Sequence, residues 1–389
     1  MASAEVSELL SLLGRTDVTS FAGGIPDPTL FPTAAIRAAY DAVLSDERQA
    51  ATALQYSVPE GFPPLRAWIA EDMRRRGLTC SAENVLITSG SQQALDFVGK
   101  LFNSPDDTVL LSWPTFLGAL QAFNAYEPRY APLPEPGSNF AAAADGPGRS
   151  KFGYVMPEFE NPTGRTLTRG DRERLLDFAD AADIPLIEDS PYETLRYAGE
   201  APPSLIGLAA ARAGGIDSCR LIYLGTFSKS IAPALRIGWM VGPKTVIARL
   251  ALVKQASDIQ VSTINQMVMH RVAPAIVPVQ AARAQSVYRA RRDAMLQALR
   301  THMPDGVAWT EPEGGFFIWV TLPRPLDAAV MLRRAVDEAK VGFVPGPAFF
   351  PDRSGRNTLR LSFSLNDAKT TDQGIFRLAA LIRDSLHAV

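Results

Sequence analysis

Short apolar runs alternate with helix-like stretches through the middle of the chain. The runs are almost entirely apolar and lie at residues 85–88, 108–112, 152–156, 185–188, 220–224 and 237–241. Stretches with helical periodicity follow several of them, at 91–102, 116–126 and 168–182. Strands that are apolar on both faces and joined by helices predict an α/β fold: a mostly parallel sheet with helices on both faces. In such folds, ligands bind outside the carboxyl ends of the strands.

The N-terminal part has a different pattern. Helices are expected at 5–13, at 34–45 with Thr33 as the N-cap, and at 65–76. Between the first two, residues 20–28 carry paired glycines and alternating prolines, which force an extended path without a helix. A well-defined but irregular stretch of this kind is typical of a binding segment that lies across a scaffold.

The C-terminal part begins with a long helical stretch at about 246–301. We interpret the arginines in its middle as a solvated helix face; they are Arg283, Arg289, Arg291 and Arg292. The residues beyond it predict antiparallel strands around a helix at 328–339, which is a smaller α+β domain. We therefore expect an N-terminal segment (1–45) that joins the small domain, a large ligand-binding domain (46–280) and a small C-terminal domain (281–389).

Reactive side chains are concentrated directly after the run 220–224. Lys229 lies just past the end of a buried strand, so partial desolvation and the nearby Arg236 would lower the pKa of its amine and make it a nucleophile. The hydroxyls of Thr226 and Ser228, together with Arg236, could hold a phosphate beside it. A lysine next to a phosphate site is what a Schiff-base cofactor such as pyridoxal phosphate requires. Taken alone, a charged surface loop explains this stretch equally well.

Other polar motifs also follow predicted strands. The turn 89–92 (Ser-Gly-Ser-Gln) precedes a helix, whose N-terminal amides favour an anion. Asn161 lies in the sharp turn 161–164 and can present its amide. Asp189 ends a buried strand, where a carboxylate needs a cation or a metal as its partner. A protonated pyridine nitrogen would serve; a metal is the rival interpretation, although no His or Cys lies nearby in the sequence. Each turn, taken alone, is also compatible with an ordinary connection.

Together these motifs resemble the fold-type-I, pyridoxal-phosphate-dependent aminotransferases of class I/II, whose fold is like that of aspartate aminotransferase. The resemblance covers essentially the whole chain and rests on the order and spacing of 89–91, 161–164, Asp189 with Tyr192, Ser228-Lys229 with Arg236, and Arg360. The chain is most similar to the 2-aminoadipate and kynurenine aminotransferase-like group, through 21–24, 54–56, 90–95 and 343–346.

The resemblance implies a role for each of these positions. Lys229 would carry the cofactor as an aldimine and then move the substrate proton, while Asp189 would pair with the pyridinium nitrogen. Asn161 and Tyr192 would bind the ring oxygen, and Arg360 would bind the substrate carboxylate in a pocket lined by Gly24 and Asn161. The implied phosphate ligands are Ser89, Gly90, Ser91, Gln92, Thr226, Ser228, Arg236 and, from a partner subunit, Tyr56. The borrowed tyrosine implies a homodimer with shared active sites.

Some positions depart from the group's pattern. Phe116 stands where the group usually has a tyrosine stacked on the ring, so stacking is retained and a hydroxyl is lost. The predicted first helix carries Glu5 and Glu8 and no arginine, which argues against an acidic donor and leaves a basic, guanidino or large apolar donor open. The loop at 134–149 also looks short for the group.

Composition narrows the remaining alternatives. The chain has 389 residues, of which 47% are hydrophobic and 21% charged, with a net charge of −2. This charge gives no basic surface for nucleic acid or an anionic membrane, and two cysteines with no signal peptide indicate the cytoplasm. We expect a ping-pong transfer of an amino group from an L-amino acid to a 2-oxo acid. A decarboxylase, lyase, oxidase or cyclase on the same fold, or a sensor resembling the aminotransferase-like half of bacterial regulators, are the alternatives.

Overall fold

The structure is a computed structural model that describes residues 17–135 and 150–387. The helix predicted at 5–13, with Glu5 and Glu8, lies outside the described residues, as does most of the loop at 134–149. Within the described residues, no helix combines the length and the apolar character needed to cross a membrane.

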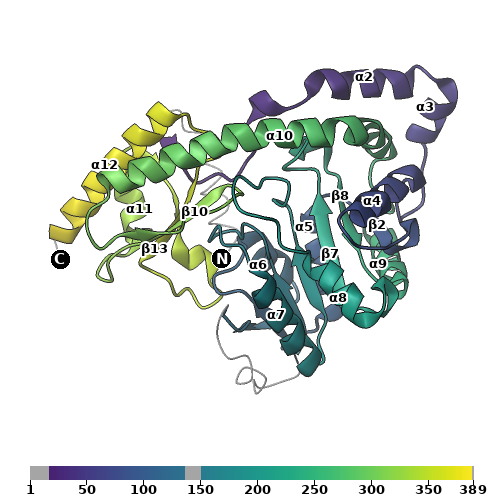
Figure 1. Ribbon diagram of the computed structural model, residues 1–389, viewed down its shortest axis with the longest axis horizontal. Helices are drawn as coiled ribbons and strands as arrows, with labels where there is room; N and C mark the ends of the chain where they lie inside the picture. Colours follow the sequence, from purple (N-terminus) through teal and green to yellow (C-terminus); the bar gives the residue numbers. More distant parts are fainter. Residues whose placement is uncertain (1–16, 136–149, 388–389) are drawn as a thin grey trace.

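A seven-stranded sheet with the order β2-β8-β7-β6-β5-β3-β4 forms the centre of the molecule (Figure 1). Its strands are β2 (Val85–Thr88), β3 (Thr108–Leu111), β4 (Arg129–Pro132), β5 (Ser150–Val155), β6 (Leu186–Asp189), β7 (Leu221–Thr226) and β8 (Gly238–Val241). The pairs from β4 through β7 are parallel, and β8 runs antiparallel to both β2 and β7. This confirms the mostly parallel sheet. The edge strand β4 was not predicted, because its exposed and half-exposed residues form no apolar run.

Helices cover both faces of this sheet, because successive side chains of a strand point to opposite faces and the inner strands are buried at nearly every position. Leu86, Ile187 and Ile222 point to the face covered by α5 (Ser91–Phe102), α6 (Leu117–Asn124) and α9 (Lys244–Ser257). The residues next to them in the strands, such as Leu186 and Leu221, point to the face covered by α4 (Pro63–Arg75), α7 (Arg169–Ala181) and α8 (Leu205–Ala213). The helix at α8 was not predicted.

The helix α10 (Thr263–His302) runs from the large sheet to the small domain (Figure 1). The prediction that its arginines form a solvated face is wrong for two of them. The side chains of Arg291 and Arg292 are 17% and 13% exposed. Arg291 pairs with Asp27, and Arg292 donates to the Pro312 carbonyl at 3.0 Å. Both are covered because this end of the helix packs on other elements instead of facing water.

The small domain contains a four-stranded antiparallel sheet with the order β12-β13-β10-β9. Its strands are β9 (Ala308–Trp309), β10 (Phe317–Thr321), β12 (Val344–Pro345) and β13 (Thr358–Ser362), and its helices are α11 (Ala328–Asp337) and α12 (Ala368–His387). The C-terminal helix α12 was not predicted. The short strand β1 (Thr19–Ser20) pairs in parallel with β11 (Val341–Gly342), so the N-terminal segment joins this part of the molecule.

Two helices connect the N-terminal segment to the large sheet. They are α2 (Thr33–Leu44) and α3 (Glu47–Ala53). Thr33 is the first residue of α2 rather than its N-cap, because Pro32 occupies the cap position and makes no side-chain cap hydrogen bond. Residues 21–27 carry no helix or strand, as predicted for the glycine- and proline-rich segment.

Candidate active site

Lys229 lies just beyond the end of β7, where it meets the N-terminal segment. Its Nζ donates to the Gly24 carbonyl at 3.0 Å and lies 5.9 Å from the centre of the Tyr192 ring. Burial, followed by the charges of Arg360 and Arg236, lowers the pKa of the amine to about 8. About a tenth of this lysine is therefore unprotonated at pH 7, far more than of an ordinary lysine, and this free amine is the nucleophilic form.

Asp189 is the last residue of β6, and its carboxyl is 1% exposed. Its Oδ2 accepts from the Tyr154 hydroxyl at 2.8 Å, whereas Oδ1 has no hydrogen-bond partner among the described residues. Burial raises the pKa of this carboxyl to about 7, and the Tyr154 hydrogen bond opposes the rise. A buried carboxyl oxygen without a partner indicates a place for a donor or cation that the chain itself does not supply.

Tyr154 was missed in the sequence. The signal was present: a phenol within a fully buried run needs a partner for its hydroxyl. What the sequence could not show is that β5 places this hydroxyl on Asp189 of the neighbouring strand. The adjacent Glu188 serves another purpose, since it accepts from the backbone amides of Leu205 and Ile206 at the start of α8.

Several residues predicted to hold the phosphate lie where the turn after β2 meets Arg236. Gly90 has a φ of +79°, and a Cβ at this position would lie 2.4 Å from the Arg236 guanidinium, so only glycine permits this approach. Arg236 donates to the Ser89 carbonyl at 3.0 Å. Ser91 begins α5, whose N-terminal amides face the same turn.

Three other predicted phosphate residues make side-chain hydrogen bonds around this turn. The Thr226 hydroxyl donates to the Ser228 hydroxyl at 2.9 Å, which keeps these two groups together. The Gln92 side chain instead donates to the Gly118 carbonyl at 2.7 Å, next to Phe116 at the start of α6.

Arg360 lies in the middle of β13 and is buried. It donates to Asn161 Oδ1 at 2.7 Å and to the Ala22 carbonyl at 2.6 Å, while its Nε has no partner among the described residues. The guanidinium lies 4.1 Å from the centre of the Phe317 ring and 5.0 Å from that of Phe349. Burial lowers the pKa of Arg360 to about 10, so it stays charged at neutral pH and keeps one donor available.

The remaining predicted residues lie as follows. Tyr192 is buried with its ring edge-on to Phe316 and Phe317, and burial raises the pKa of its phenol. Tyr56 is 78% exposed in the loop between α3 and α4.

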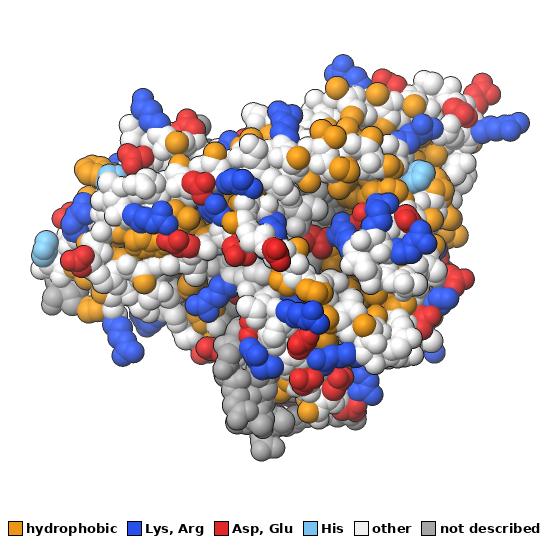
Figure 2. Space-filling model, in the orientation of Figure 1, with side chains coloured by type: hydrophobic (Ala, Val, Ile, Leu, Met, Phe, Trp, Pro, Cys, Tyr) orange, Lys and Arg blue, Asp and Glu red, His pale blue; other side chains and the backbone are white. Residues whose placement is uncertain are grey.

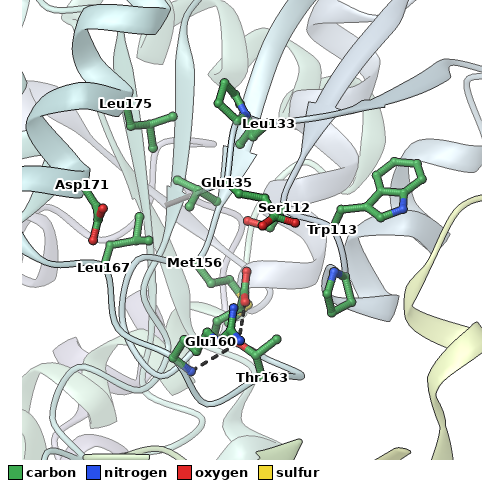
Figure 3. Close-up of a pocket in the computed structure, with 14 residues that line it drawn as sticks. Ser112, Trp113, Leu133, Glu135, Met156, Glu160, Thr163, Leu167, Asp171 and Leu175 are labelled. Atoms are coloured by element: carbon green, nitrogen blue, oxygen red, sulfur yellow. Dashed lines mark hydrogen bonds between the residues drawn. The ribbon is translucent and has the colours of Figure 1, made fainter. Parts of the chain in front are cut away.

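A separate cavity is lined in part by Glu160 and Thr163 (Figure 3). Its lining includes Ser112, Trp113, Glu160 and Thr163, and none of the predicted site residues. Glu160 accepts from the Thr163 hydroxyl at 2.6 Å, and burial raises the pKa of its carboxyl. The chemistry described above is therefore placed at the strand ends and not in this cavity. Among the described residues, no cluster of three or more His, Cys, Asp or Glu side chains could hold a metal.

Lys229 of lowered pKa and the buried Asp189, whose Oδ1 has no partner among the described residues, thus lie at the ends of neighbouring strands, and Arg360 of the small sheet binds the same N-terminal segment as Lys229. A family model for aminotransferases of class I and II matches residues 17–377. The chain belongs to this family. An aromatic-amino-acid aminotransferase from Thermococcus litoralis is 41% identical over 397 aligned positions, covering 99% of this chain and 93% of the relative. A 2-aminoadipate transaminase from Thermus thermophilus is 40% identical, covering 99% and 95%.

Solved structures agree with these relatives. The kynurenine aminotransferase from Pyrococcus horikoshii, in a complex with pyridoxamine phosphate (PMP), is 40% identical with a TM-score of 0.90, covering 98% of this chain and 95% of that one. The α-aminoadipate aminotransferase from Thermus thermophilus, in a complex with N-(5'-phosphopyridoxyl)-L-leucine, is 37% identical with a TM-score of 0.89, covering 100% and 98%. The predictions of an aminotransferase and of pyridoxal phosphate as its cofactor are confirmed.

The residues of this aminotransferase fit the cofactor. Asp189 Oδ1, which has no partner among the described residues, is a suitable partner for a pyridinium nitrogen, and the N-terminal amides of α5 beside Arg236 suit a phosphate. Lys229 would supply the amine, and its lowered pKa suits covalent attachment.

Proposed function

We propose that this aminotransferase takes a large apolar or aromatic L-amino acid as its donor and a 2-oxo acid as its acceptor. The observation that carries the proposal is the aromatic setting of Arg360, whose guanidinium lies close to the rings of both Phe317 and Phe349. Trp319 joins Phe349 in a buried cluster, and Leu117 and Phe350 pack against it. The side chain of an acidic donor would require a second cation beyond Arg360, and the side chain of a basic donor would require a carboxylate. The described neighbours of Arg360 are instead chiefly aromatic.

Relatives support this choice of donor. One is named an aromatic-amino-acid aminotransferase, and one structural neighbour is a kynurenine aminotransferase. The test is a single-turnover panel on the purified protein with pyridoxal phosphate bound, in which absorbance follows conversion by phenylalanine, leucine, glutamate, 2-aminoadipate and arginine. We expect phenylalanine and leucine to react at least about tenfold faster at equal concentration. Faster conversion by glutamate or arginine would refute the proposed donor class.

The proposed roles of the residues are those that the resemblance implies, and the contacts described above support them. When bound, pyridoxal phosphate supplies the electron sink that stabilises negative charge at the substrate Cα. Lys229 attaches the cofactor and then moves the proton at Cα. Asp189 keeps the pyridine nitrogen protonated, and Asn161 and Tyr192 bind the ring oxygen. Arg360 binds the substrate carboxylate beside Gly24.

The other proposed roles concern cofactor binding. Phe116 stacks on the ring, and the phosphate is held by a group of small, polar and basic residues. That group consists of Ser89, Gly90, Ser91, Gln92, Thr226, Ser228 and Arg236. Lys229→Ala should abolish the covalent attachment that borohydride traps, while Lys244→Ala, which changes an exposed lysine, should leave it intact. Retained turnover in Lys229→Ala would contradict the mechanism.

We also propose a homodimer in which Tyr56 reaches the phosphate site of the partner subunit. Large hydrophobic side chains are exposed around this residue: Leu54 is 73% exposed and Val58 47%. Figure 2 shows further hydrophobic side chains between α2 and α4. An apolar surface of this kind supports burial against a second copy.

A hybrid dimer tests the shared site. When Lys229→Ala and Tyr56→Phe chains are combined, a tyrosine acting on the partner gives one site with both native residues, so native cofactor affinity returns in half of the sites. A tyrosine acting within its own chain leaves every site of the hybrid impaired.

The division into parts 1–45, 46–280 and 281–389 is likewise proposed, supported by the separation of the seven-stranded sheet from the four-stranded sheet. A cytoplasmic location is proposed on the two cysteines, Cys80 and Cys219, which are both free thiols.

A further inference from the structure

The side chain of Gln260 binds the main chain on both sides of Tyr56. Its Oε1 accepts from the Ser57 amide, and its Nε2 donates to the Gln55 carbonyl at 3.4 Å. The same Nε2 donates to the Thr263 hydroxyl at 3.2 Å, which ties it to the start of α10. One amide group therefore fixes the backbone around an exposed tyrosine that is distant in sequence.

The loop that carries Gln260 is itself firmly held. The fully buried Lys254 of α9 pairs with Asp258, and Asp258 Oδ2 accepts from Gln93 Nε2 at 2.7 Å. The backbone amide of Gln260 donates to the Asp258 carbonyl at 2.7 Å. Between them, Ile259 has a φ of +65°, a strained conformation for a β-branched residue that persists only where its surroundings fix it.

The same loop also reaches this chain's own phosphate turn. Gln93 Oε1 accepts from the Ser89 amide at 2.8 Å, so Asp258 and Ser89 are joined through one side chain. The loop 258–260 is thus connected to the turn that holds the phosphate in one subunit and to the tyrosine proposed to reach the phosphate of the other.

A tyrosine that acts on a neighbouring chain has to be placed before the partner arrives. A hydrogen bond to a phosphate requires the phenol oxygen to lie within a few tenths of an ångström of its ideal position. A flexible loop would lose conformational entropy when this bond fixed it, which would weaken binding. Tyr56 is 78% exposed, so packing of its own ring does not fix its position. The backbone bonds from Gln260 supply that constraint.

We propose that Gln260 is a positioning residue, which holds Tyr56 in the orientation that reaches the phosphate bound by the partner subunit. This inference rests on the proposed homodimer and on the proposed role of Tyr56. Gln260 acts through Tyr56, and the anchoring of its loop by Asp258 and Gln93 makes the constraint rigid.

The experiment is a double-mutant cycle in the full-length protein. The dissociation constant of pyridoxal phosphate is measured by spectral titration for Tyr56→Phe, Gln260→Ala and the double variant, at concentrations where sedimentation shows dimers. Each single change should raise the dissociation constant by about tenfold, as loss of one hydrogen bond to a charged group does. In the Tyr56→Phe background, Gln260→Ala should add less than about twofold.

Two further variants sharpen the cycle. Gln260→Glu keeps the acceptor for the Ser57 amide and loses the Nε2 donor, so its dissociation constant should lie between those of the parent and Gln260→Ala. Gln297→Ala removes an exposed glutamine of α10 that binds only within its own helix, and it should change nothing.

The possible failures are distinguishable. If Tyr56→Phe weakens cofactor binding but Gln260→Ala does not, or if the two effects multiply, the role of Gln260 is wrong and the shared site stands. If Tyr56→Phe leaves the dissociation constant unchanged, the proposed role of Tyr56 is wrong and the inference fails with it.

Discussion

Replacing Asp189 by asparagine should make the cofactor-free protein more stable at pH 8, relative to the parent protein, than at pH 5. The carboxyl is 1% exposed, receives one hydrogen bond from Tyr154 and has no partner for Oδ1 among the described residues. Without a cofactor, an ionised carboxylate at this position is desolvated, and the hydrogen bond from Tyr154 offsets only part of the cost. Asparagine has nearly the same shape, can still accept from Tyr154, and carries no charge at any pH.

The expected magnitude follows from the pKa of this group. Burial raises the pKa of Asp189 from 3.8 to about 7. Between these values the folded protein retains a proton that the unfolded chain has lost, so stability falls as pH rises and reaches its lower level above pH 7. From pH 5 to pH 7 this spans about two pKa units, or about 3 kcal/mol. The unpaired amide of the asparagine adds a cost of about 1–3 kcal/mol that does not depend on pH.

The assay is urea unfolding of the cofactor-free parent and of Asp189→Asn at pH 5 and pH 8. Titration of all other groups is shared by the two proteins, so the difference between them isolates this carboxyl. From pH 5 to pH 8, the unfolding free energy of the variant minus that of the parent should increase by about 3 kcal/mol. The exposed Asp305→Asn should show no such movement. A difference that is the same at both pH values would refute the reasoning, because the carboxyl would then not be desolvated in the folded protein. Saturating pyridoxal phosphate should favour the parent protein at pH 8, since the buried charge then has its partner.

Three further predictions concern the same site. Arg360→Lys keeps the charge but cannot bind Asn161 and the Ala22 carbonyl together, so the dissociation constant for the amino acid should rise by about tenfold to a hundredfold in spectral titrations, with the bound-cofactor absorbance intact. Tyr154→Phe removes the hydrogen bond that lowers the pKa of Asp189, so the pKa should rise further and cofactor affinity should fall by about tenfold; unchanged affinity would exclude a positioning role for Tyr154. Because the pKa of Lys229 is lowered to about 8, the rate of covalent attachment of added pyridoxal phosphate should rise with pH and level off above about pH 8 in stopped-flow absorbance, whereas a rate that climbs to pH 10 would indicate an ordinary lysine.

The strand ends could be predicted from sequence because their signals are local. The bounds of β2 and α5 match the predicted ranges, and the small residues between them mark the turn where Gly90 meets Arg236. Strand β4 was missed because it is half exposed at the edge of the sheet and forms no apolar run. Helix α12 was missed although its buried residues, among them Ile375, Leu378 and Ile382, recur at helical spacing.

Side-chain partners were harder to predict than elements, because they depend on tertiary register. Arg291 and Arg292 have the composition of a solvated helix face, yet their surroundings come from segments hundreds of positions away or from the small domain. The bond from Tyr154 to Asp189 and those from Gln260 around Tyr56 likewise join residues whose proximity depends on the packing of the whole chain.

The irregular segment at 21–24 shows why absence of secondary structure matters for this site. A helix or a strand would use its carbonyl oxygens in its own ladder of hydrogen bonds. Here the Ala22 carbonyl accepts from Arg360 and the Gly24 carbonyl accepts from Lys229, so consecutive parts of one segment hold two cations that repel each other. A Cβ at position 24 would lie 2.3 Å from the Phe317 ring, and glycine therefore lets the backbone come close enough to do this. The glycines and prolines that prevent a regular element are thus what leave these carbonyls available to Lys229 and Arg360.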